Sequence, residues 1–139
     1  MSALTSNRNT AEILCHAEKF HRLVPVKSSC FLYVGAIGAI DTESGKAEPA
    51  ADQAGLVVAG RVEGFSAGGK AIIKSGVFKY DNGTDEEKVT LNELNKTVYI
   101  LDDHTFGRLG GTHKIRGGVL RDIDSDGQLI VEIGTLTLD

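Results

Sequence analysis

Short apolar runs separated by turn residues fill the sequence from Leu23 onward, and they limit its fold more than any other feature. The runs are rich in aromatic and β-branched residues, which favour strands, and clusters of Gly, Asp, Asn and Ser follow them. The runs expected to hold strands are 30–40, 55–63, 70–80, 97–101, 113–123 and 128–138. The sequence therefore predicts an all-β fold, a small β-barrel or sandwich of roughly six to eight short strands.

Glycine supports this prediction, because it makes up 17 of the 139 residues, about 12% against roughly 7% in an average protein. Some glycines stand between predicted strands, as Gly45, Gly83 and Gly127 do. Others fall inside apolar runs, namely Gly35, Gly38, Gly60 and Gly76. Interior glycines indicate bulges, sharp bends or close backbone approach, which a small curved sheet needs.

The sequence also predicts how three connections fold. Residues 90–93, Thr-Leu-Asn-Glu, match a capping box, in which a hydroxyl and a carboxylate satisfy backbone donors at a helix start. We therefore expect one or two short helices. Residues 124–127, Asp-Ser-Asp-Gly, are expected to join the last two strands as a hairpin, and the acidic run 85–87 to be a solvated loop.

The first twenty residues differ in character from the rest. Residues 1–9 are polar and aperiodic, so we predict an extended N-terminal arm, 1–20, followed by a β body, 21–139. Within the arm, Thr10 and the apolar spacing after it favour a short helix. Pro25 and the β-rich stretch that follows it favour extended structure instead, so both conformations stay open.

Charge and composition exclude several classes of protein. The net charge is −4 and the basic residues are scattered, which disfavours nucleic-acid binding. No apolar run approaches the roughly 18 residues of a membrane helix, and the N-terminus lacks the pattern of a secretory signal. Cys15 and Cys30 could form one bridge, but in a chain made in the cytoplasm we expect two thiols.

Two groups of residues resemble metal sites without completing one. The residues Asp122, Asp124, Asp126 and Gly127 open like a calcium loop, but Ile133 stands where that loop needs a bidentate Glu, so we interpret them as a β-turn. The other group is Cys15, His16, His21 and Cys30, whose spacing matches no paired zinc scheme. The sequence predicts no metal and no cofactor.

The sequence also offers no catalytic constellation. Residues 102–104, Asp-Asp-His, place two carboxylates beside an imidazole, but a triad depends on the geometry of distant residues, and no G-x-S-x-G elbow is present. The glycine pairs 68–69, 110–111 and 117–118 lack the lysine and spacing of a phosphate-binding loop. An enzyme would require His104 or His113 to meet a carboxylate and a nucleophile in a cleft.

Several stretches, taken in order, share the pattern of one protein family. They are the polar residues 4–10, the runs 35–47 and 54–61, residues 75–78 followed by Asp81 and Asn82, and the closing parts 98–105 and 117–127. In this order they resemble the small capsid decoration (cement) proteins encoded in the head-gene clusters of tailed phages and prophages.

The resemblance implies a structural virion protein that is not an enzyme. Such proteins bind the outer surface of a phage head, often as homotrimers, and stabilise the lattice of the major capsid protein. By this resemblance we expect the chain to be made in the host cytoplasm and to reside on the capsid surface. The arm residues expected to contact the capsid or a second subunit are Leu4, Thr5, Arg8, Asn9 and Thr10.

The alternative interpretation is a β-barrel module that binds a sugar or a peptide, with an enzyme less favoured. A ligand-binding module would be expected to have a deep pocket lined by aromatic residues, for which the sequence offers Phe31, Tyr33, Phe78 or Tyr99. The absence of Trp and an aromatic content of 6% disfavour sugar stacking.

Overall fold

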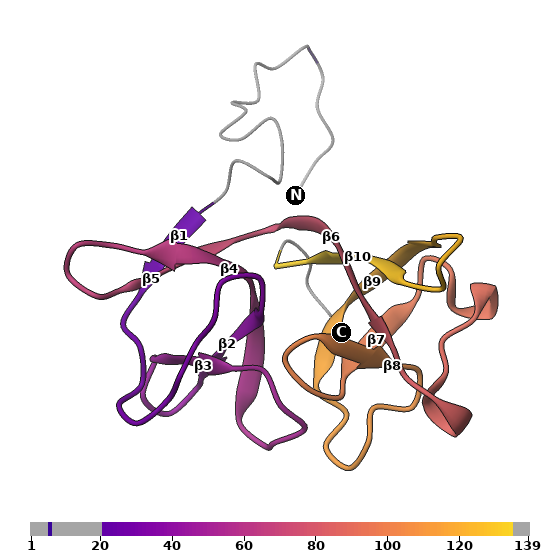
Figure 1. Cartoon of the computed structure of the whole chain (residues 1–139), viewed down its shortest axis with the longest axis horizontal. Helices are drawn as coiled ribbons and strands as arrows, with labels where there is room; N and C mark the ends of the chain where they lie inside the picture. Colours follow the sequence, from indigo (N-terminus) through magenta and orange to yellow (C-terminus); the bar gives the residue numbers. More distant parts are fainter. Residues whose placement is uncertain (1–5, 7–20, 135–139) are drawn as a thin grey trace.

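The computed structural model describes residue 6 and residues 21–134, which form the all-β fold that the sequence predicts (Figure 1). Five strands form one sheet and five form a closed barrel, and two short 3₁₀ helices lie in one connection. Several predictions fall outside the described residues: the arm with Leu4, Thr5, Arg8, Asn9 and Thr10, the residues Cys15 and His16, and the end of the last predicted strand, 135–138.

The sheet contains the N-terminal strands of the body, in the order β1-β5-β4-β2-β3, all antiparallel. Their bounds are β1 His21–Val24, β2 Ile37–Asp41, β3 Ala47–Pro49, β4 Leu56–Phe65 and β5 Ala71–Lys74. The chain after β1 also reaches β3 on the opposite side, where Lys27 N donates to Ala47 O and Ala47 N to Pro25 O, both at 2.8 Å. The sheet therefore curls around a core of its own, which includes Val24, Val62 and Ile73.

The barrel contains the C-terminal strands in the closed order β10-β6-β8-β7-β9. Their bounds are β6 Gly76–Asn82, β7 Thr97–Ile100, β8 Thr105–Gly107, β9 Arg116–Ile123 and β10 Leu129–Ile133. All pairs are antiparallel except β6 with β8, which is parallel. Phe106 fills the barrel and meets the edge of Tyr80, with ring centroids 5.2 Å apart.

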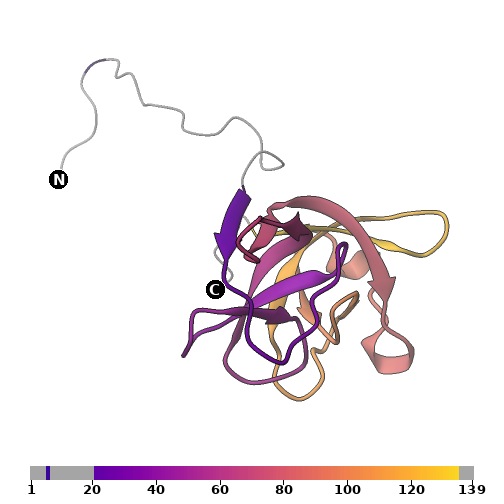
Figure 2. The same ribbon diagram turned by 60° about the vertical axis from the view of Figure 1, so that its left-hand side comes forward.

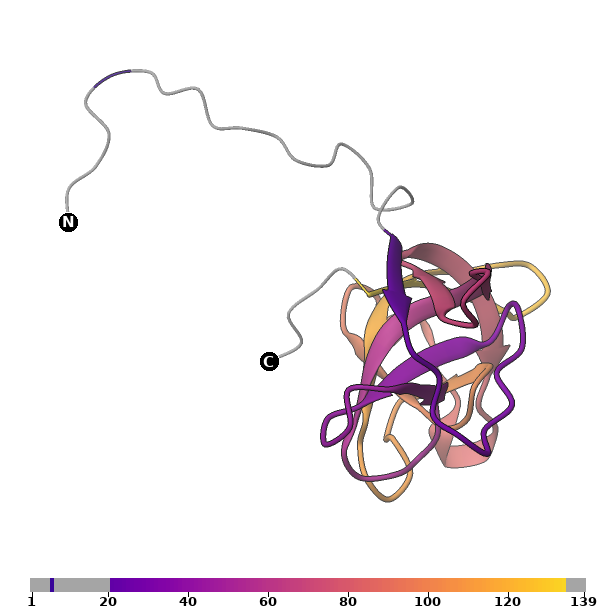
Figure 3. The ribbon, with the colours of Figure 1, turned by 90° about the vertical axis from the view of Figure 1, so that its left-hand side faces the viewer.

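The sheet and the barrel share one apolar core. Ile37 and Leu56 of the sheet belong to the same buried cluster as Tyr80 and Leu129 of the barrel. Ser75 alone separates β5 from β6, so one run of chain passes from the sheet into the barrel. The turned views (Figures 2 and 3) show β1 at the margin of the described body, where it pairs with β5.

The interior glycines mark a bulge, as the sequence predicts. The pairing of β2 with β4 shifts between Gly38 and Ala39, because Gly38 lies opposite Gly60 while Ala39 lies opposite Val58. Gly60 has a φ of 150°, and a Cβ there would overlap the carbonyl oxygen of Lys74. Only glycine therefore fits at this crossing of β4 and β5.

The predicted strand over 30–40 is wrong in its first half. Only Ile37–Asp41 is a strand, because Gly35 adopts a φ of 92° and Ala36 N donates to Tyr33 O in a turn. Similarly, the run 70–80 divides into β5 and β6, which is one reason why the described residues contain ten strands.

The predictions for the capping box and for the last hairpin are confirmed, whereas the one for the acidic run is wrong. The capping box forms at η3, Leu91–Glu93, where Thr90 N donates to Glu93 Oε1 at 2.9 Å. The hairpin at 124–127 is also present, since Gly127 N donates to Asp124 O. The acidic run is not a solvated loop but the helix η2, Asp85–Glu87, and Glu87 is bonded to another loop.

Candidate functional site

A group of ionisable side chains lies where β6 and β8 run parallel. Asp81 of β6 pairs with Thr105 of β8, which brings the Asp81 carboxylate beside the preceding residue, His104. His104 Nδ1 donates to Asp81 Oδ2 at 2.9 Å, and His104 Nε2 lies 3.5 Å from Asp102 Oδ1. The turn itself is closed by Asp102, whose Oδ1 accepts the backbone N–H of His104. The predicted triplet 102–104 thus gains a fourth member, Asp81, that sequence spacing did not reveal.

The electrostatics of this group favour a charged pair. The hydrogen bond to Asp81 raises the pKa of His104, with Asp102 and Asp103 adding to the effect and partial burial opposing it. The bond from His104 is also the main reason why the pKa of Asp81 is lowered, and Gln128 Nε2 adds a bond at 3.2 Å. The surrounding carboxylates therefore favour the protonated imidazole over the neutral one.

This geometry does not supply the relay that an enzyme would require at His104. Thr105 Oγ1 lies 3.1 Å from the same nitrogen, Nδ1, that already donates to Asp81. The other nitrogen faces Asp102. A general base needs a free nitrogen toward its nucleophile, and both nitrogens here face carboxylates.

The same loop contains the one trio of metal-ligating residues found within residues 21–134. Donor atoms of Asp102, Asp103 and His104 lie within 4.8 Å of one another, a spacing that a divalent cation could bridge. A cation bound at Nε2 beside Asp102 would have to displace the proton on that nitrogen, whereas the Nδ1–H bond to Asp81 could remain, as in the carboxylate–histidine pairs that orient metal ligands.

A second arrangement, which we call the carboxylate clamp, fixes the loop between β8 and β9. It consists of Glu87 and Asp52 with the backbone of residues 109–113, whose five successive N–H groups donate to the two carboxylates. Glu87 accepts from Leu109, Gly110 and Gly111 at 2.8, 3.0 and 2.8 Å. Asp52 accepts from Thr112 and His113 at 2.8 and 2.7 Å.

The clamp carboxylates are held in their ionised form. The hydrogen bond from Thr112 N is the main cause that lowers the pKa of Asp52, and burial opposes it. Burial raises the pKa of Glu87, but the bonds from the three amides together outweigh it, so that this pKa is also lowered. The glycine pair 110–111 therefore surrounds the protein's own carboxylate instead of a phosphate. Sequence reasoning missed the clamp because Asp52 lies 60 residues from its nearest partner.

His113, the second histidine considered for catalysis, belongs to this clamp. Its Nδ1 lies 3.0 Å from both the carbonyl oxygen and Oδ1 of Asp52. The ring therefore reinforces the contact that its own backbone N–H makes with the same carboxylate.

Residues 30–36, which we call the aromatic loop, present apolar side chains outward from a fixed backbone. Phe31, Tyr33 and Val34 are 79%, 67% and 60% exposed, whereas Leu32 between them is buried in the sheet core. Gly35 N donates to Val62 O at 2.9 Å, so the far end of the loop is bonded to β4. At the near end Cys30 N donates to Lys27 O, and Lys27 is itself bonded to β3, so the loop is anchored on both sides of its exposed residues.

The aromatic residues considered for a ligand pocket do not converge. Phe78 packs against Tyr80 and lies under the guanidinium of Arg61, 5.1 Å from its ring centroid. Tyr99 lies under the ammonium group of Lys114 on another part of the barrel. Phe31 and Tyr33 lie on the exposed loop, so the groove described below is lined by none of these four rings.

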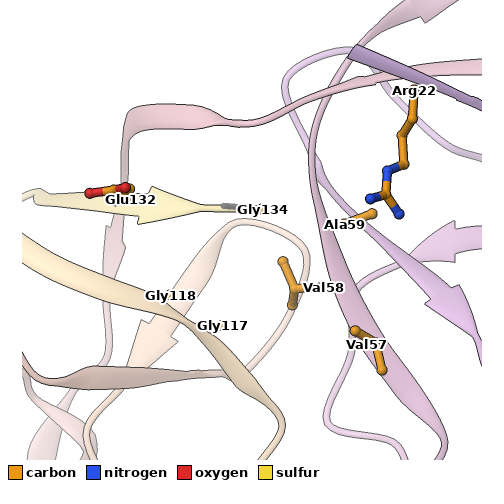
Figure 4. Close-up of a pocket in the computed structure, with 8 residues that line it drawn as sticks. All are labelled: Arg22, Val57, Val58, Ala59, Gly117, Gly118, Glu132 and Gly134. Carbon is orange, nitrogen blue, oxygen red and sulfur yellow. The ribbon is translucent and has the colours of Figure 1, made fainter. Parts of the chain in front are cut away.

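A groove of about 190 Å³ opens between the sheet and the barrel (Figure 4). Its lining residues are Arg22, Val57, Val58, Ala59, Gly117, Gly118, Glu132 and Gly134. Ligand pockets for drug-sized molecules measure roughly 300–1,000 Å³, so this groove is too small for a typical small-molecule site.

Asp124, the central residue of the calcium-like motif, has structural contacts instead. Asp124 bonds Lys79 Nζ at 2.9 Å and accepts the N–H groups of Asp126 and Gln128, which closes the hairpin turn. The bond to Lys79 is the main cause that lowers the pKa of Asp124. Ile133, at the position where a calcium loop needs Glu, is buried in the barrel. Cys30 has a free thiol.

Within residue 6 and residues 21–134, no helix is long and apolar enough to cross a membrane. Comparison with known proteins gave no match, whether to family models, to curated proteins or to solved structures.

Proposed function

We propose that this chain is a structural virion protein, a decoration (cement) protein that binds the outer surface of a phage head as a homotrimer. In this role it stabilises the lattice of the major capsid protein. The proposal follows the ordered resemblance of residues 4–10, 35–47, 54–61, 75–78, 98–105 and 117–127 to that family. No cofactor or catalytic step belongs to it.

The observation that carries the proposal is the aromatic loop. Exposed aromatic side chains are enriched at protein interfaces, where a few buried anchors supply most of the binding energy. Phe31 and Tyr33 are exposed while the backbone around them is bonded to the body, so docking would order little additional chain. Such a fixed, apolar projection suits contact with a capsid subunit.

The test is co-sedimentation of the purified protein with empty heads assembled from the major capsid protein of the same genome. We expect saturable binding to these heads and a trimer by sedimentation velocity. Heads of an unrelated phage are the control. Failure to bind the cognate heads would refute the proposal.

The double variant Phe31→Ala/Tyr33→Ala tests the role of the loop. If the two rings are interface anchors, losing them costs about 2 kcal/mol or more of binding, which is roughly a 30-fold weaker affinity. Leu91→Ala is the matched control, since Leu91 is 61% exposed on η3. Both variants should keep the melting temperature of the wild type, because the side chains removed are mostly outside the core.

Deleting residues 4–10 tests the arm separately. We expect weaker binding to heads and an unchanged melting temperature of the body. An equal affinity after the deletion would remove Leu4, Thr5, Arg8, Asn9 and Thr10 from the proposed contact.

A further inference from the structure

The turn between β7 and β8 presents a histidine nitrogen beside two carboxylates. Donor atoms of Asp102, Asp103 and His104 lie within 4.8 Å of one another, and His104 Nε2 lies 3.5 Å from Asp102 Oδ1. Zn²⁺ binds nitrogen and oxygen at about 2.0–2.2 Å, so two ligands of a tetrahedral site lie about 3.4 Å apart. The pair formed by Nε2 and Oδ1 already has this separation, and a rotation of the partly exposed Asp103 carboxylate brings the third donor into range.

Asp81 holds the imidazole in the orientation that a metal ligand needs. A carboxylate can only accept, so His104 Nδ1 donates to Asp81 Oδ2, at 2.9 Å. The other oxygen of Asp81 accepts from Gln128 Nε2 at 3.2 Å, so the carboxylate is itself fixed. Histidines that bind metals almost always donate their second ring N–H to such a partner, which leaves the remaining nitrogen for the metal. Here the remaining nitrogen is Nε2, on the side of Asp102.

The backbone that carries the three ligands is bonded to both halves of the molecule. The carbonyl oxygen of Asp103 accepts from Ile37 N of β2 at 2.8 Å. The carbonyl oxygen of His104 accepts from Asp81 N of β6 at 2.9 Å. Asp102 Oδ1 closes the turn by accepting the N–H of His104, also at 2.9 Å. Because the turn is already held in place, binding of an ion would order little additional chain.

The negative charge around His104 has no basic side chain to balance it. Asp81, Asp102 and Asp103 all act on the imidazole, and within residues 21–134 none of these carboxylates forms an ion pair with a lysine or an arginine. A divalent cation would relieve the repulsion among them. An imidazole combined with carboxylates suits Zn²⁺ better than Ca²⁺ or Mg²⁺, which take oxygen ligands.

We propose that His104, Asp102 and Asp103 bind a divalent transition-metal ion of the zinc type, with Nε2 as the nitrogen ligand and water completing the coordination. Asp81 is the positioning residue, because it touches the ring and not the ion. The ion stabilises the turn next to the short parallel pairing of β6 with β8, which closes the barrel. This inference goes beyond the proposed function and does not depend on it.

Calorimetric titration of the tag-free chain with Zn²⁺ tests the site. All variants carry Cys15→Ser and Cys30→Ser, because thiolates also bind zinc. At about pH 7.5 we expect one ion per chain, and His104→Ala should weaken its affinity about tenfold or more. His113→Ala is the matched control, since it removes a histidine bonded to the single carboxylate of Asp52, and it should leave the affinity unchanged. Equal affinities of His104→Ala and the parent chain, or no binding by the parent, would overturn the proposal.

Two further measurements separate a coordinating histidine from one that only supports the fold. Asp81→Asn keeps every proposed ligand but weakens the acceptor of Nδ1–H, so the affinity for Zn²⁺ should fall about tenfold or more. Asp85→Asn removes the same charge from an exposed position and should have no effect. In ¹H–¹⁵N spectra of the imidazole, Zn²⁺ should shift the Nε2 resonance of His104 while Nδ1 keeps its proton. Coordination through Nδ1, an unchanged affinity of Asp81→Asn, or tighter binding of Ca²⁺ than of Zn²⁺ would overturn the proposal.

Discussion

Replacing Glu87 with alanine tests whether the carboxylate clamp holds the loop between β8 and β9. The substitution removes the acceptor of three backbone N–H groups, those of Leu109, Gly110 and Gly111. No other hydrogen-bond partner of these N–H groups is present within residues 21–134. The clamp therefore predicts a loss of stability from a side chain that lies outside the apolar core.

The magnitude follows from the three bonds. A hydrogen bond to a charged group contributes about 1.5–3 kcal/mol, but water can replace an exposed one at little cost. The bonds from Leu109 and Gly111 are exposed and that from Gly110 is partly buried, so the full sum does not apply. We expect Glu87→Ala to lower the free energy of unfolding by about 2–3 kcal/mol, which for a domain of this size lowers the melting temperature by about 8–12 °C.

Calorimetry on three variants measures this effect. Glu87→Gln keeps the shape of the side chain but loses its charge and turns an N–H₂ group toward at least one backbone donor, so it should fall between Glu87→Ala and the wild type. Glu86→Ala, the neighbouring exposed carboxylate, is the matched control and should melt within about 1 °C of the wild type. If Glu87→Ala melts together with Glu86→Ala, the clamp does not stabilise the fold and the reasoning is refuted.

Three further predictions test the fold and its charges. First, folding lowers the pKa values of Glu87 and Asp52, so the stability that the two carboxylates contribute is present above their unfolded pKa values of about 4.3 and 3.9 and is lost as the pH falls through the folded ones. Between pH 6 and pH 3 the melting temperature of the wild type should therefore fall more steeply than that of Glu87→Gln. Equal slopes would contradict this. Second, Gly60→Ala should destabilise the protein by about 2–4 kcal/mol in chemical denaturation, whereas Gly64→Ala, where a Cβ meets nothing within 4 Å, should cost about 1 kcal/mol or less. Third, the hydroxyl of Tyr80 is buried without a hydrogen-bond partner among the described residues, so Tyr80→Phe should leave the melting temperature unchanged or raise it, and a drop of more than about 4 °C would show a missing partner.

The sequence predicts the fold class well because that class depends on local patterns. Alternation in 128–133, the capping box at 90–93 and the turn at 124–127 each involve neighbours in the chain, and each forms as expected. The wrong half of the run 30–40 shows the limit of such patterns. Its residues are as apolar as those of a strand. In the folded protein, however, Leu32 is buried in the sheet core while its neighbours Phe31 and Tyr33 are exposed, and this difference depends on tertiary packing.

The candidate site is less predictable because its contacts join distant residues. Asp81 reaches His104 through a parallel pairing of β6 and β8, 23 residues apart, and nothing in the sequence indicates that two strands are parallel. In the clamp, Asp52 binds residues 60 and 61 positions away, and Glu87 binds residues 22 to 24 positions away. A carboxylate that will bind a loop looks, in sequence, the same as one that faces solvent, so the run 85–87 predicts a solvated loop although Glu87 binds one.

Several acidic side chains of this protein accept hydrogen bonds from the backbone of its connecting turns and loops. A small body of short strands leaves many backbone N–H groups outside the ladders, and each of them needs an acceptor. Asp52, Glu87, Asp102 and Asp124 all provide one, and each binds the N–H groups of a turn or a loop. Asp102 and Asp124, which the sequence offers as candidate site residues, are therefore engaged in holding the fold. The exposed side chains of the aromatic loop lie outside the core, so under the proposed function binding should depend on Phe31 and Tyr33 more than on charge and should be only weakly sensitive to salt.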